Sequence, residues 1–73
     1  MFYSIIREQG ASFEPEVISA MTAAYRAALG ELGLLESDDA ATRMVAKKVI
    51  ELAAQGERDP ARLKIATFAA LRT

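Results

Sequence analysis

The chain has 73 residues and a formal net charge of −1, with 26% charged residues and with neither cysteine nor histidine. This composition excludes disulfide bonds, thiolate nucleophiles, zinc sites that need cysteine or histidine, and imidazole acid–base catalysis. The near-zero net charge argues against strong sequence-independent binding to nucleic acid or to anionic lipid.

A single core of this size gives marginal stability, and small domains usually compensate with disulfides, a metal or a partner subunit. Without cysteine and histidine, association with a partner is the remedy that remains. No apolar run approaches the ~20 residues of a bilayer-spanning helix, and the start lacks the basic region and cleavage site of a signal peptide. We therefore expect a complete, soluble, cytoplasmic protein that does not contact membranes.

The first segment, residues 1–12, is an apolar arm with the sequence FYSII at 2–6. Its aromatic and β-branched residues would suit a strand. No other segment resembles a strand, however, and an isolated strand is not stable. A strand paired with its symmetry mate across a dimer stays open, but we favour a short helix or extended arm that packs on the last helix or on a second chain.

Helix boundaries in the remaining domain, residues 13–73, are marked by prolines, acids and glycines. Proline fits the first turn of a helix, Ser and Asp cap helix starts, and glycine takes the left-handed conformation that ends a helix. The residues expected to cap helices are Pro15, Gly33, Ser37, Gly56, Asp59 and Pro60. They predict an all-α fold, a compact three-helix domain with helices at about 15–32, 38–55 and 60–72.

The first two of these helices each have a clear apolar face at helical spacing. In 15–32 the face consists of Val17, Ile18, Met21, Ala24, Tyr25, Ala28, Leu29 and Leu32. In 38–55 it consists of Thr42, Val45, Ala46, Val49, Ile50, Leu52 and Ala53. A second stripe in 15–32 holds the small residues Ala20, Ala23, Ala27 and Gly30. This stripe is either an exposed surface of good helix formers or a close contact between helices.

The helix at 60–72 is apolar on two sides. One side carries Leu63, Ala66, Thr67, Ala70 and Leu71, and nearly opposite lie Ile65 and Phe68. A helix that is apolar on two sides is expected to be covered on both. The arm, a second copy of the chain or another partner could cover Ile65 and Phe68. The predicted contact residues are Phe2, Ile5, Ile6, Ile65 and Phe68.

The segment GERDPARL at 56–63 is the most motif-like stretch. A phosphate-binding loop would need several glycines with a lysine and a hydroxyl at fixed offsets, and these are absent. We therefore interpret it as a turn between helices. The acids Glu36, Asp38 and Asp39 lack the spacing of a calcium loop, and no histidine activates a serine or threonine. We expect no catalytic residue, metal, cofactor or small-molecule substrate, and hence no enzyme.

DNA binding is the alternative function. The helices at 38–55 and 60–72, joined by a turn with glycine, could form a helix-turn-helix. The second helix offers Arg62 and Lys64 to a groove, but Ile65 and Phe68 are poor groove contacts. Whether Arg58, Arg62 and Lys64 contact anything beyond solvent is left open by the sequence. Nucleic acid is thus the less favoured partner.

Three segments carry a family resemblance: F-E-P-E at 13–16, A-K-K-V-I-E-L-A at 46–53 and G-E-R-D-P-A-R-L at 56–63. They resemble a group of small helical bacterial proteins of unknown function, in which an F-[DE]-P-E start precedes a helix ending in G-E-R-D-P-x-R-L. The resemblance covers about residues 13–71. It implies a compact helical domain and brings no catalytic residues. The expected function is a non-catalytic, cytoplasmic interaction or regulatory module, as a homodimer or with a helical partner.

Overall fold

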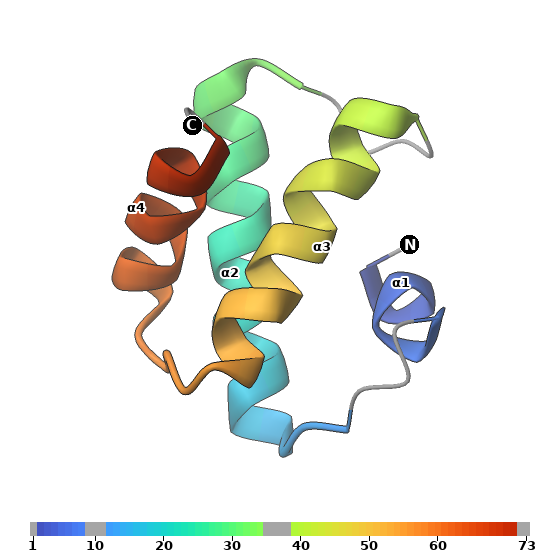
Figure 1. Ribbon diagram of the computed structural model, residues 1–73, viewed down its shortest axis with the longest axis vertical. Coiled ribbons are helices and arrows are strands. Elements are labelled where there is room, and N and C mark those ends of the chain that lie inside the picture. Colours follow the sequence, from blue (N-terminus) through green and yellow to red (C-terminus); the bar gives the residue numbers. More distant parts are fainter. Residues whose placement is uncertain (1, 9–11, 35–38, 72–73) are drawn as a thin grey trace.

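The computed structural model describes residues 2–8, 12–34 and 39–71 and contains four helices in these ranges (Figure 1). They are α1 (Phe2–Glu8), α2 (Pro15–Leu32), α3 (Ala40–Ala54) and α4 (Pro60–Leu71). The helices α2, α3 and α4 pack against one another in pairs, and α1 packs against α3. No strand occurs in the described ranges, so the all-α prediction is confirmed, and residues 2–8 of the arm form the short helix α1.

The bounds of α2 are those predicted from its proline and glycine. The carbonyl of Glu14 accepts hydrogen bonds from the amides of Val17 and Ile18, both at 3.0 Å. The helix therefore begins at Pro15, directly after Glu14. At the other end Gly33 has φ 70°, in the left-handed region. The amide of Gly33 donates a 3.2 Å hydrogen bond to Gly30 O, and the amide of Leu34 donates a 2.9 Å hydrogen bond to Leu29 O. This pair of bonds is a Schellman motif, which explains why glycine ends the helix.

The start of α3 differs by two residues from the prediction. Asp39 caps it, because its carboxylate accepts a 2.8 Å hydrogen bond from the amide of Thr42. Ser37, the predicted cap, lies outside the described residues. The helix ends as expected before Gly56, which has φ 114°. The capping predictions for α4 are confirmed: it begins at Pro60, and the Asp59 carboxylate accepts a 2.9 Å hydrogen bond from the amide of Ala61.

The core receives side chains from all four helices. Its buried hydrophobic members are Phe2, Ile5, Ile6, Val17, Met21, Ala24, Tyr25, Ala28, Leu29, Val45, Ala46, Val49, Ile50, Ala53 and Leu63. The predicted faces of α2 and α3 are therefore mostly correct. Leu32 is an exception, because its side chain is 46% exposed in the last turn of α2, where it lines a hollow described below.

The arm belongs to this core. Phe2 stacks on Tyr25 of α2, with ring centroids 4.7 Å apart and ring planes inclined by 19°. Glu8 forms an ion pair with Arg43 of α3. From the sequence, the arm was expected to pack on the last helix or on a second chain. In the structure α1 is held by α3 and α2, so its main contact is not with the last helix, α4.

The last helix is buried on one side and open on the other. Leu63 and Thr67 are buried, and the Thr67 hydroxyl donates a 2.7 Å hydrogen bond to Leu63 O, which satisfies this polar group inside the core. Ile65 is 63% exposed, and Phe68 is half-buried against the core. The described helices include none that combines the length and the hydropathy of a membrane span.

Candidate interaction surface between α2 and α4

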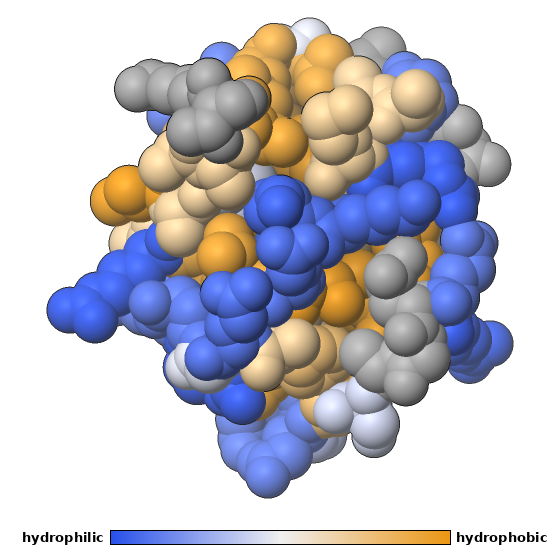
Figure 2. All heavy atoms as spheres, viewed as in Figure 1, coloured by the Kyte–Doolittle hydropathy of each residue, from blue (hydrophilic) through white to orange (hydrophobic). Residues whose placement is uncertain are grey.

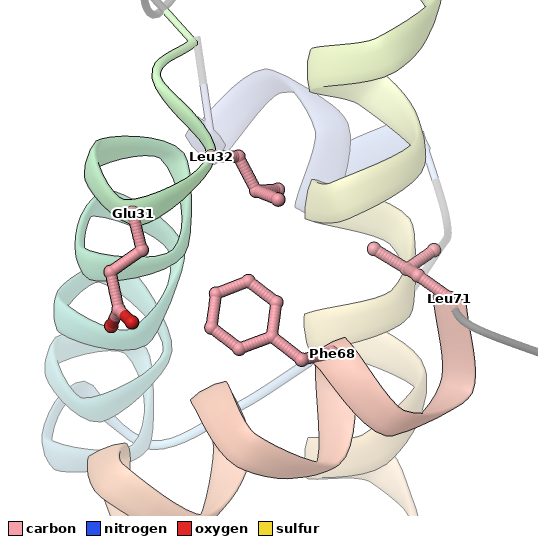
Figure 3. Close-up of a pocket in the computed structure, with 4 residues that line it drawn as sticks. All are labelled: Glu31, Leu32, Phe68 and Leu71. Atoms are coloured by element: carbon pink, nitrogen blue, oxygen red, sulfur yellow. The ribbon is translucent and has the colours of Figure 1, made fainter.

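A hollow of about 370 Å³ lies between the C-terminal ends of α2 and α4 and is lined by Glu31, Leu32, Phe68 and Leu71. Figure 3 shows the Phe68 ring projecting from α4 toward α2, with Leu32 pointing inward from the end of α2. Three of the four lining residues are apolar. The hollow is therefore suited to an apolar side chain rather than to a polar substrate.

The hollow exists because both helices end near it with large apolar residues that the core covers only in part. Phe68 and Leu71 pack against the core yet keep part of their surface in solvent. In the view of Figure 2, hydrophobic atoms gather at the top of the molecule, around the ends of α2 and α4. A band of hydrophilic side chains crosses the middle, and smaller groups of hydrophobic atoms lie beside and below it.

An ion pair lies at the edge of the hollow, where Lys64 of α4 reaches Glu31 of α2. The two side chains are 29% and 52% exposed, respectively, so solvent screens the pair and it adds only ~0–1 kcal/mol to stability. Lys64 and Phe68 are four residues apart and hence share one side of α4. The pair leaves this region without net charge.

Ile65 and the exposed alanines extend the apolar region. Ile65 lies one turn before Phe68 on α4, and the exposed Ala27 lies one turn before Glu31 on α2. We define the α2–α4 surface by its contributing residues: Ala27, Glu31 and Leu32 from α2, with Lys64, Ile65, Phe68 and Leu71 from α4. In the small-residue stripe, Ala23, Ala27 and Gly30 are exposed and Ala20 is half-buried against the core, so most of the stripe faces solvent within this chain.

Of the five predicted contact residues, only Ile65 and Phe68 lie on this surface. Phe2, Ile5 and Ile6 are 4%, 0% and 5% exposed, because α1 buries them within its own chain. Leu32 and Leu71 are the two large apolar residues of the surface that were not among the predicted contact residues. The signal for both was their position in the last turn of a helix, where fewer neighbours are available to cover an apolar side chain.

The segment at 56–63 forms a closed, hydrogen-bonded turn at 56–59 and then the start of α4. The Glu57 carboxylate accepts hydrogen bonds from the amides of Arg58 and Asp59 at 3.1 and 3.2 Å. The Arg58 guanidinium donates to the carbonyl of Ala53 near the end of α3 and to that of Glu57. Its polar groups thus satisfy the backbone of the turn, as expected for a connection between helices.

Two other kinds of site were considered from the sequence, a metal site and a helix-turn-helix. Among the described residues, no three Asp or Glu side chains are grouped so that they could hold a metal ion. For a helix-turn-helix, the exposed side of α4 offers Arg62 together with Ile65 and Ala69, while Lys64 is paired with Glu31. Such a side carries little of the polar surface that reads base edges.

No protein-family model, curated protein or solved structure matches the chain. The resemblance to small helical bacterial proteins therefore stays a prediction, and the function has to be argued from the α2–α4 surface itself.

Proposed function

We propose that this chain is a non-catalytic, cytoplasmic interaction or regulatory module that binds a helical protein surface through its α2–α4 surface. The observation that carries the proposal is Ile65, which is 63% exposed beside a hollow lined by Leu32, Phe68 and Leu71. A single exposed aliphatic side chain is ordinary, whereas apolar residues that gather around a hollow are typical of a contact site.

The energetics favour occupation of this surface. Full burial of an isoleucine or leucine side chain is worth ~1.5–3 kcal/mol relative to exposure. Ile65 keeps more than half of its surface in solvent and Leu32 nearly half, and Phe68 and Leu71 each keep a smaller part. A partner that covered all four would recover a free energy comparable to that of a weak to moderate complex, after the cost of association.

The charge of the region supports a protein partner over a charged ligand. Its one acid and one base already pair with each other, so neither offers an unsatisfied charge to a phosphate or a metal. Helix-in-groove contacts depend instead on apolar anchors at helical spacing, and Ile65 and Phe68, three residues apart on α4, present such a spacing with Phe68 as the anchor.

Site-specific photocrosslinking tests the proposal. A benzoylphenylalanine placed at position 65 in cells that make the full chain should give adducts of discrete mass. The same group at position 44 is the matched control, since Met44 is similarly exposed at 58% but lies on α3 beside Arg43 and Lys47. No discrete adduct from position 65, or equal adducts from both positions, would overturn the proposed interaction surface.

A further inference from the structure

We infer that the occupant of the α2–α4 surface is a second copy of this chain, related by a two-fold axis that brings Glu31 of each chain to Lys64 of the other. The inference rests on the proposed function, because it names the partner of the same surface. It follows from the charges, the shape and the area of that surface.

The charge pattern is self-complementary. In a two-fold dimer the same surface of both chains forms the interface. If one residue contacts a second residue of the partner, the second residue of the first chain makes the same contact in return. With one glutamate and one lysine at the edge of the hollow, rotation can place each acid beside the partner's base at two symmetry-related positions. In the dimer each Lys64 exchanges Glu31 of its own chain for Glu31 of the other chain, so both charges stay paired, whereas a strongly acidic or strongly basic partner would find no surplus charge to pair with.

The shape is self-complementary in the same way. Ile65 projects into solvent one turn before Phe68, and Phe68 lines the hollow, so a knob and a hole lie side by side on α4. The hollow of about 370 Å³ exceeds by far the ~30 Å³ that one water occupies in the liquid, and it admits a branched aliphatic side chain. In a two-fold arrangement each Ile65 can enter the hollow of the other chain.

The area allows a reversible dimer. The chain exposes 4480 Å², and a standard interface takes about 800 Å² from each partner, which is nearly a fifth of this surface. One face formed by two adjacent helices of a small molecule supplies an area of that order. The exposed Ala27 adds no bulk, so the partner's helices can approach closely.

Charge exchange between chains tests the arrangement. Glu31→Lys and Lys64→Glu each replace two attractions across the axis with two repulsions, and each should weaken dimerisation about tenfold. In an equimolar mixture of the two variants, every contact across the axis is attractive again while the repulsion within each chain remains. Sedimentation of the wild type, each variant and the mixture, from about 10 μM to about 1 mM chain, should show dimers restored only in the mixture.

Apolar variants provide the matched comparison. Ile65→Asp should abolish the dimer, Met44→Asp should leave it unchanged, and circular dichroism should show both variants folded, because both positions are exposed. A wild-type chain that stays monomeric at about 1 mM would overturn the inference. The inference would also be overturned if the Ile65→Asp variant dimerised as well as the wild type, or if the equimolar mixture of Glu31→Lys and Lys64→Glu stayed monomeric. Crosslinking from position 65 to a different protein would retain the proposed function and exclude only the second copy.

Discussion

Truncation of Ile5 tests whether α1 is part of the core or an arm for a second chain. The Ile5 side chain is 0% exposed among α1 and the helices that hold it. Replacing a fully buried isoleucine with alanine costs ~2–5 kcal/mol, through lost transfer free energy and the cavity left behind. A domain of 73 residues has a total stability of roughly 4–11 kcal/mol, so Ile5→Ala removes a substantial fraction of it.

Urea unfolding followed by circular dichroism measures this loss. With a slope of about 1 kcal/mol per molar urea for so small a domain, the midpoint should fall by about 2 M or more. Ser4→Ala is the control, because Ser4 is exposed on the same helix and its substitution should shift stability by less than about 0.5 kcal/mol. The chain should be studied first at a concentration where the wild type is monomeric and then at higher concentrations.

Two results would refute this reasoning. If Ile5→Ala and Ser4→Ala had equal effects, α1 would not belong to the core. If the loss for Ile5→Ala grew with protein concentration, the isoleucine would contact a second chain instead. A helix of seven residues is not stable alone, so its formation depends on the packing that this experiment removes.

Three further predictions concern the helix ends and the alternative function. Gly33→Ala should lower the free energy of unfolding by ~1–2 kcal/mol. The cause is backbone strain alone, because φ is 70° at this position and an added Cβ meets no neighbour. A fall in melting temperature of less than about 4 °C would contradict this prediction. Asp39→Ala should cost ~0.5–2 kcal/mol in urea unfolding through loss of the bond to Thr42, and Asp39→Asn should recover most of it, whereas equal losses would show that the cap contributes nothing. The wild type should show no salt-dependent binding to mixed duplex DNA; binding whose salt slope fell by about one with Arg62→Ala would instead favour the DNA-binding alternative.

The sequence predicted those elements whose limits are set by local chemistry. The bounds of α2 followed from Pro15 and Gly33, since each acts through its own backbone geometry. The start of α4 followed from Asp59 and Pro60 for the same reason. The start of α3 was less accurate, because adjacent Ser and Asp residues can each cap a helix and the local sequence does not determine which one does.

The conformation of the arm was less determined by the sequence, although a signal was present. Phe2, Ile5 and Ile6 are spaced as i, i+3 and i+4, which is a helical period, but the run is too short to outweigh its β-branched composition. The helix that α1 would contact could not be predicted, because that choice depends on tertiary packing around Tyr25. The same limit applies to Leu32, whose exposure depends on where α4 ends and not on its own position in α2.

The contact of α1 with α3 has a consequence during synthesis of the protein. Glu8 and Arg43 are separated by 35 positions in the chain, and ribosomes add ~5–20 residues per second, so α1 waits roughly 2–7 s for its docking site to be made. During that interval Phe2, Ile5 and Ile6 have no α3 to cover them. The apolar side of α1 therefore becomes buried only late in synthesis, after most of the chain has been made.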